Sequence, residues 1–136
     1  KPELECFDSG HTQGTWPLID MGLLKAPYQF SFIVGVLGGI PGEVESLQLQ
    51  TKIMPAEREG ECIAISHGHW RMLATAAVMG GNVRTGLEDH LYLPNGEMAA
   101  SNGALVEVAA RIVRDIGRRP ATVDEARAIL SLPEPR

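Results

Sequence analysis

Hydrophobic residues along the chain follow two alternating patterns. Short runs rich in β-branched and aromatic residues are typical of strands, and stretches with apolar residues every three or four positions are typical of helices. The predicted strands cover residues 3–8, 28–36, 61–66 and part of 80–89. The predicted helices cover residues 15–24, 43–53, 70–79, 101–117 and 122–130.

This order gives repeating strand–helix units, which predict a parallel sheet covered by helices. Four such units form either a small open α/β sheet or half of a (β/α)8 barrel, and the pattern alone does not separate the two. We expect one α/β domain over residues 1–136, with the four units in 1–117 and a helix and tail in 118–136. Residues 133–136 are expected to be frayed.

The first strand carries two carboxylates in an otherwise apolar setting. Alternation places Glu3 and Glu5 on one face with Phe7, and Leu4 and Cys6 on the other. Because an unpaired buried carboxylate is costly, these glutamates either face a polar cavity or mark an edge strand.

Residues 35–42 form a glycine-rich loop between the second strand and the next helix. Such a loop allows backbone amides to approach an anion near a helix N-terminus. It lacks the established phosphate-binding fingerprints, so a tight turn that requires positive φ angles is the simpler interpretation.

His67 and His69 follow the third strand with a spacing suited to metal ligands, because alternate residues of an extended chain point the same way. The alternatives are that both histidines are polar residues that cap the next helix, or that one faces a ligand and the other is solvated.

The stretch from Gly80 to Asp89 combines a short strand with glycines and three ionisable side chains, Arg84, Glu88 and Asp89. Their apolar flanks predict that the charges converge at the end of a buried strand. An arginine beside two carboxylates can bind a metal, orient an acid or base, or neutralise an anionic substrate. The alternative is a salt-bridged strand terminus.

Composition narrows the class of protein. The chain has 136 residues, 44% of them hydrophobic, and a net charge of −5, which argues against a nucleic-acid-binding protein. No apolar run is long enough to span a membrane, and the N-terminus lacks a signal-peptide pattern. Cys6 and Cys62 lie in apolar strands and do not form a disulfide framework. A cytoplasmic protein is expected.

Several segments together resemble the β-keto acid cleavage enzymes, of the 3-keto-5-aminohexanoate cleavage type. The resemblance rests on residues 2–8, 35–41 and 80–93, with support from Ser101-Asn102 and from residues 117–130. The Val-Arg-x-Gly-Leu-Glu-Asp element at 83–89 is its most specific part.

The resemblance implies a (β/α)8 barrel with a divalent metal, usually zinc. It implies the transfer of the acyl part of a β-keto acid to coenzyme A from acetyl-CoA, with release of acetoacetate by retro-Claisen cleavage. Glu88 then corresponds to the carboxylate zinc ligand, and Arg84 and Asp89 to the pair that activates the substrate and holds its charge. Glu5, or in second place Glu3, corresponds to a polar position near the substrate.

The same resemblance places Gly38 and Gly39 near the acyl-CoA. It covers only the C-terminal half of the family's barrel, and the two histidines that complete the zinc site in the family come from an early strand. His67 and His69 do not correspond to them. We therefore expect a partner, either an N-terminal half-barrel or further copies in a homo-oligomer.

Three hypotheses follow from the sequence. The first is the acyltransferase, complete only with its N-terminal half. The second is a non-catalytic half-barrel that oligomerises or binds small anions. The third is a different metal enzyme, in which His67 and His69 join Glu88.

Overall fold

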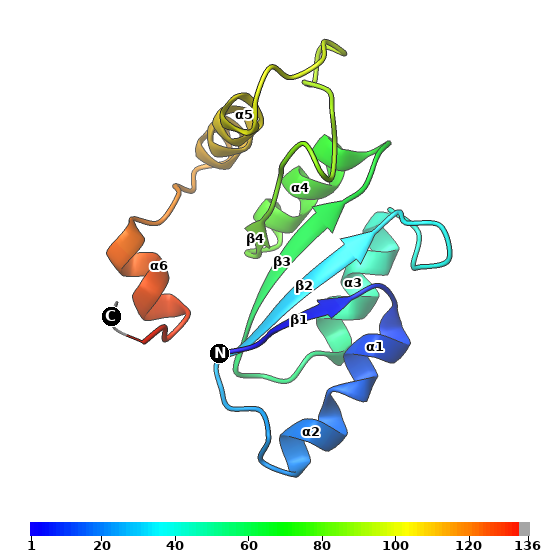
Figure 1. Ribbon diagram of the computed structural model, residues 1–136, viewed down its shortest axis with the longest axis vertical. Helices are drawn as coiled ribbons and strands as arrows, with labels where there is room; N and C mark the ends of the chain where they lie inside the picture. Colours follow the sequence, from blue (N-terminus) through cyan, green and yellow to red (C-terminus); the bar gives the residue numbers. More distant parts are fainter. Residues whose placement is uncertain (134–136) are drawn as a thin grey trace.

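The computed structural model describes residues 1–133 and contains a four-stranded parallel sheet (Figure 1). The strands lie in the order β1, β2, β3, β4, and each is hydrogen-bonded to the next in the chain. Helices alternate with them, so the predicted (β/α)4 half-barrel is confirmed. The strands are β1 (Glu3–Cys6), β2 (Tyr28–Val34), β3 (Arg58–Ala64) and β4 (Asn82–Val83). The helices are α1 (Ser9–Gly14), α2 (Trp16–Asp20), α3 (Val44–Ile53), α4 (His69–Val78), α5 (Asn102–Asp115) and α6 (Val123–Ile129).

One face of the sheet forms the hydrophobic core. Cys6, Phe32 and Cys62 lie side by side on this face in the strand register, and all three are buried. Leu47 of α3 and Met72 of α4 pack against them. Burial of this apolar surface is the main force that holds the helices on the sheet.

The opposite face of the sheet is polar. Glu5, Ser31, Glu61 and Asn82 occupy one row of the register across all four strands. Glu3, Gln29 and Glu59 form a second row, two residues earlier along the strands. The prediction that Glu3 and Glu5 share a face away from Leu4 and Cys6 is confirmed. The name "polar face" is used below for these seven residues.

Within the described residues, β1 and β4 each pair with one neighbour only, so each leaves one edge of the sheet without a strand partner. β1 is an edge strand of the sheet, as the second interpretation of its glutamates expected. Unpaired edges of a parallel sheet leave backbone donors and acceptors available for another strand.

The first helical region differs from its prediction. Asp8 caps α1 by accepting hydrogen bonds from the amides of Gly10 and His11, at 2.7 and 3.2 Å. This cap turns the expected break after the first strand into a helix start. The helix predicted over residues 15–24 is only five residues long, and the side chain of Leu23 is 67% exposed.

The other predicted elements are present with shifted bounds. β3 begins at Arg58, three residues before the predicted start at Glu61, because its ladder with β2 extends that far. On α3, Leu47 is buried as expected, but Leu49 is exposed and the polar Gln50 is buried in its place. Gln50 is accommodated because its Oε1 accepts a hydrogen bond from Thr12 of α1 at 2.6 Å.

The last two helices carry their predicted signals. Leu105, Val108 and Ala109 of α5 are buried. Thr122 and Glu125 form the predicted capping box of α6. Of the tail predicted to be frayed, residues 134–136 lie outside the described part of the chain. No helix in the described part has the length and apolar character needed to cross a membrane.

Candidate functional site

Arg84 joins three carboxylates at the carboxyl end of the sheet. It follows β4 directly, and its backbone amide donates to the carbonyl of Cys62 at 3.2 Å. Its guanidinium lies 3.5 Å from Glu5 Oε1, 3.0 Å from Glu88 Oε2 and 3.4 Å from Asp89 Oδ1. The convergence of charges predicted for residues 80–89 is therefore present, and Glu5 joins it from β1, at the opposite edge of the sheet. These four residues form the arginine–carboxylate cluster.

The members of this cluster differ in burial, and this separates their possible roles. The side chain of Asp89 is 4% exposed, whereas that of Glu88 is 84% exposed. Burial raises the pKa of Asp89, and the positive charge of Arg84 opposes the rise. Asp89 is thus a carboxylate of increased basicity held against a cation, which suits a proton acceptor. The exposed carboxylate of Glu88 can contact a ligand that binds at the carboxyl ends of the strands.

Backbone hydrogen bonds fix the loop that carries Glu88 and Asp89. The Asp89 amide donates to the Gly86 carbonyl at 3.0 Å, and the Asp89 carbonyl accepts from the Ser66 amide at 3.2 Å. Asn102, at the start of α5, accepts from the Leu87 amide at 2.8 Å. Contacts from the segment after β3, from α5 and from the loop itself therefore set the position of Asp89.

His69 is a structural partner of the same loop. Its Nδ1 lies 2.5 Å from the Ala64 carbonyl oxygen, and its Nε2 lies 2.8 Å from Thr85 Oγ1. The ring is buried and stacks on His90, with centroids 4.7 Å apart. His69 therefore connects α4 to the residue that follows Arg84. Sequence reasoning missed this role, although the position of His69 at a helix start was one of the two interpretations.

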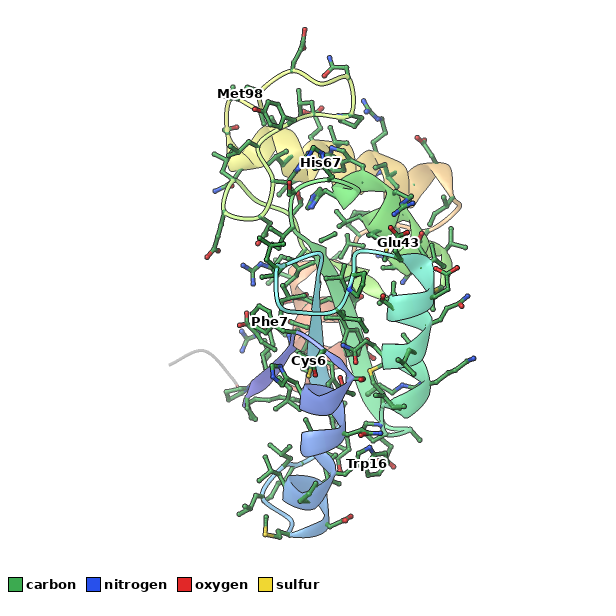
Figure 2. All side chains as sticks on the ribbon, turned by 90° about the vertical axis from the view of Figure 1, so that its right-hand side faces the viewer. Cys6, Phe7, Trp16, Glu43, His67 and Met98 are labelled. Atoms are coloured by element: carbon green, nitrogen blue, oxygen red, sulfur yellow. The ribbon has the colours of Figure 1, made fainter. Side chains whose placement is uncertain are left out.

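His67 is exposed in the loop before α4. Figure 2 shows it at the same end of the molecule as Met98, far from Trp16 of α2. Since both ring nitrogens of His69 already have partners within the chain, the pair does not present two free ligands. Among residues 1–133, no group of three or more His, Cys, Asp or Glu side chains is arranged to hold a metal ion. The third hypothesis, with His67, His69 and Glu88 around a metal, therefore lacks its geometry.

The glycine-rich loop after β2 adopts the tight turn that was its simpler interpretation. Gly35 and Gly38 have φ angles of 84° and 89°, in the left-handed region. A side chain at Gly39 would place its Cβ 2.8 Å from the Phe7 carbonyl oxygen, which is closer than real contacts allow. The loop is held against the end of β1, where the Ile40 amide donates to the same carbonyl at 2.7 Å.

The polar face contains a second group that sequence reasoning did not identify. Ser31 Oγ lies within hydrogen-bonding distance of Glu3, and 2.8 Å from Glu61 Oε1. Burial, with a further contribution from the charge of Glu3, raises the pKa of Glu61 from 4.5 to about 7. A single hydroxyl has one proton to donate, so two carboxylates around it require one further proton. The sequence signal for this group was the spacing of Glu59 and Glu61, which places both on one face of a strand. The predicted strand began at Glu61, so Glu59 was not recognised as part of it.

The fold and this geometry define a parallel α/β half-barrel with charged side chains at the carboxyl ends of its strands, where ligand sites of such sheets lie. The family profile described as beta-keto acid cleavage enzyme matches residues 1–132. The chain belongs to the β-keto acid cleavage enzyme family.

Curated relatives agree with this assignment. The chain is 37% identical over 132 residues to a 3-keto-5-aminohexanoate cleavage enzyme of Fusobacterium nucleatum, covering 97% of this chain and 48% of the relative. It is 32% identical to a 3-dehydrocarnitine:acetyl-CoA trimethylamine transferase of Rhizobium meliloti, covering 97% and 44%. It is 30% identical to a 3-oxoadipate:acetyl-CoA acetyltransferase of Cupriavidus necator, covering 98% and 48%. The chain thus spans about half the length of the curated relatives it matches.

Proposed function

We propose that this chain is the C-terminal half of a β-keto acid cleavage acyltransferase. The reaction converts a β-keto acid and acetyl-CoA into an acyl-CoA and acetoacetate. The observation that carries the proposal is the arginine–carboxylate cluster, because it unites the residues that the resemblance assigns to the site. The names of the relatives in Rhizobium meliloti and Cupriavidus necator, which include acetyl-CoA, support the co-substrate.

Each member of the cluster has a proposed role. Arg84 binds the carboxylate of the β-keto acid, for which its planar guanidinium offers two parallel hydrogen bonds. Asp89, with its raised pKa, accepts a proton from the substrate during activation. Glu5 contacts the substrate from β1, and Gly38 and Gly39 form the side of the site where the acyl-CoA lies.

Zinc is part of the proposal, with ligands from outside the described residues. Glu88 is the one candidate ligand here, and its Oε2 accepts from Arg84 at 3.0 Å. A structural or catalytic zinc site needs three or four protein ligands, and residues 1–133 by themselves do not supply such a group. When bound, zinc would polarise the keto carbonyl as a Lewis acid.

A partner that supplies the other half-barrel completes the proposal. The sheet leaves an edge of β1 and an edge of β4 without a strand partner in the described residues, and a closed barrel would cover both. The partner is an N-terminal half-barrel or further copies of the chain in a homo-oligomer. Location in the cytoplasm stays a prediction.

The experiment measures the native mass of the chain and its zinc content, first alone and then co-expressed with the N-terminal half of a relative. We expect the pair to associate, bind zinc and form acetoacetate from acetyl-CoA and a β-keto acid, and we expect Glu88→Gln to lose the zinc. A stable pair that binds zinc but forms no acetoacetate would contradict the reaction. A monomer that neither pairs nor binds zinc would favour the non-catalytic half-barrel.

A further inference from the structure

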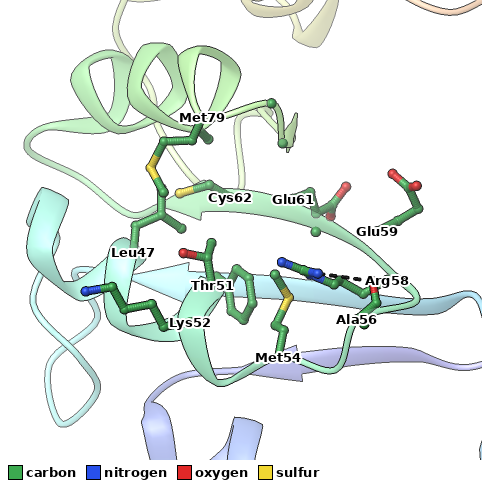
Figure 3. A pocket seen from close by; sticks show the side chains of 15 residues that line it. Leu47, Thr51, Lys52, Met54, Ala56, Arg58, Glu59, Glu61, Cys62 and Met79 are labelled. Carbon is green, nitrogen blue, oxygen red and sulfur yellow. Dashed lines mark hydrogen bonds between the residues drawn. The ribbon is translucent and has the colours of Figure 1, made fainter.

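A cavity of about 720 Å³ lies between α3 and α4, over the amino end of β3 (Figure 3). It is on the helix-covered face of the sheet, opposite the polar face. The arginine–carboxylate cluster is at the carboxyl ends of the strands, so the cavity is separate from the proposed acyltransferase site. Its volume falls within the range of small-molecule sites in proteins.

The deep walls of the cavity are apolar. Figure 3 shows Leu47 and Cys62 on one side and Met54 on the other, with Met79 above them. Burial raises the pKa of Cys62 to about 12, so its thiol is protonated and contributes an uncharged surface. The remaining apolar side chains of the lining come from Phe32, Ala56 and Ala76.

Gly60 and Gly81 allow the backbone to form the floor. A Cβ at Gly60 would touch Phe32 and Met54, at 3.4 Å from each. A Cβ at Gly81 would lie 3.1 Å from the Gly60 carbonyl oxygen. The backbone at Gly60 of β3 and at Gly81, just before β4, therefore approaches closely beneath the cavity. The chemical shifts of these backbone amides should change when a ligand binds.

Two basic side chains, Arg58 and Lys52, line the cavity. Arg58 points into it, and its Nη1 donates to the Ala56 carbonyl at 3.0 Å, which leaves other guanidinium donors for a ligand. Lys52 lies at the opposite rim. Neither cation has a carboxylate within 4.0 Å among residues 1–133.

Two glutamates contribute to the lining, but their carboxylates bind elsewhere. Glu59 Oε2 accepts from Asn82 at 3.2 Å, and Glu61 Oε1 lies 2.8 Å from Ser31 Oγ. Both contacts are on the polar face. Arg58 and Lys52 are therefore the charged side chains at the cavity without a carboxylate partner among residues 1–133.

We infer that this cavity binds a medium-chain monocarboxylate, with the alkyl chain along Leu47, Met54 and Met79 and the carboxylate on Arg58. A neutral ligand would leave the cation without a partner, and a short dianion would leave the apolar walls exposed to water. Charge-assisted hydrogen bonds from a guanidinium to a carboxylate are among the strongest in proteins, which favours this class of ligand.

The test titrates the chain with decanoate, using calorimetry for affinity and amide chemical shifts for location. We expect the largest shifts at Gly60, Gly80 and Gly81, and decanoate should bind at least about tenfold more tightly than decanol. Arg58→Gln should weaken decanoate binding about tenfold, whereas Arg111→Gln, an exposed arginine on α5, should not change it.

A blocking variant separates the cavity from other apolar surfaces. Thr51 lines the cavity, so Thr51→Trp should abolish binding, and Gln48→Trp on the exposed side of α3 should preserve it. Circular dichroism verifies that each variant is folded. Three results would overturn the inference: equal affinity for decanol, shifts concentrated outside the cavity, or no binding to a folded wild-type chain.

Discussion

The Nε2 atom of His69 lies 2.8 Å from the hydroxyl oxygen of Thr85, and this contact joins the start of α4 to the residue after Arg84. The other ring nitrogen faces a carbonyl oxygen, which can only accept, so Nδ1 carries the proton. In the neutral ring Nε2 then accepts the Thr85 hydroxyl proton. Burial lowers the pKa of His69, which favours this neutral form.

Replacing His69 by leucine is expected to lower the free energy of unfolding by about 1–3 kcal/mol, because it leaves the Ala64 carbonyl and the Thr85 hydroxyl without this partner. His69→Gln, which keeps a donor and an acceptor, should cost less. Urea unfolding measures both, with His67→Leu as the exposed control. An equal cost for His67→Leu would contradict this role.

Glu61 predicts a pH dependence of stability. Its pKa in the folded chain is about 7, above the ordinary value of 4.5, so its protonated form is favoured by folding. Its contribution is therefore complete below pH 4.5 and is lost as the pH rises through about 7. After allowance for partial exposure, the loss is on the order of 2 kcal/mol.

The measurement is urea unfolding of the wild type and Glu61→Gln between about pH 4 and about pH 8, a range that encloses the affected window. Glutamine cannot ionise, so the variant should gain stability relative to the wild type as the pH rises. Glu45→Gln, at an exposed position of α3, is the control. If the free energy of unfolding depends on pH in the same way for wild type and Glu61→Gln, Glu61 does not hold the further proton beside Ser31.

Arg84→Lys tests the arginine–carboxylate cluster. An ammonium keeps the charge but loses the planar fork that reaches three carboxylates, so we expect kcat/KM for acetoacetate formation to fall at least about a hundredfold. The assay uses the chain co-expressed with the N-terminal half of a relative. Arg111→Lys should leave activity unchanged, and full activity in Arg84→Lys would remove Arg84 from the substrate site.

The pair of Thr12 and Gln50 predicts a coupled effect on stability. Thr12→Val leaves the buried Gln50 Oε1 without its donor, and Gln50 Nε2 already has no partner in the described structure. The single variant should cost about 1–3 kcal/mol, whereas Thr12→Val combined with Gln50→Leu should recover most of it. A double-mutant cycle by thermal unfolding measures the coupling, and additive losses would contradict it.

Local sequence was sufficient for much of the fold. The strand–helix repeat followed from periodicity, and the capping box of α6 followed from Thr122 and Glu125, because these signals act within one turn. The burial of Gln50 on α3, where Leu49 was expected to face inward, was missed for a tertiary reason. Thr12 binds Gln50 across 38 positions, and no local pattern contains that contact.

The candidate site was also predictable only where its residues are close together in the sequence. Arg84, Glu88 and Asp89 are neighbours in the chain, so their convergence at a strand end could be inferred from the sequence. The meeting of Glu3 and Glu61 at the Ser31 hydroxyl could not, because it depends on a register that aligns three strands on Ser31.

By itself, the sequence determined the family, the parallel (β/α)4 order and the charged loop after the last strand. Each of these depends on patterns and motifs formed by residues that are close together in the chain. The tertiary structure decided that His69 turns inward to Thr85 rather than toward a metal with His67. It also decided that Glu61 lies beside Ser31 and that a cavity remains between α3 and α4. These features depend on the strand register and helix packing, which only long-range contacts set.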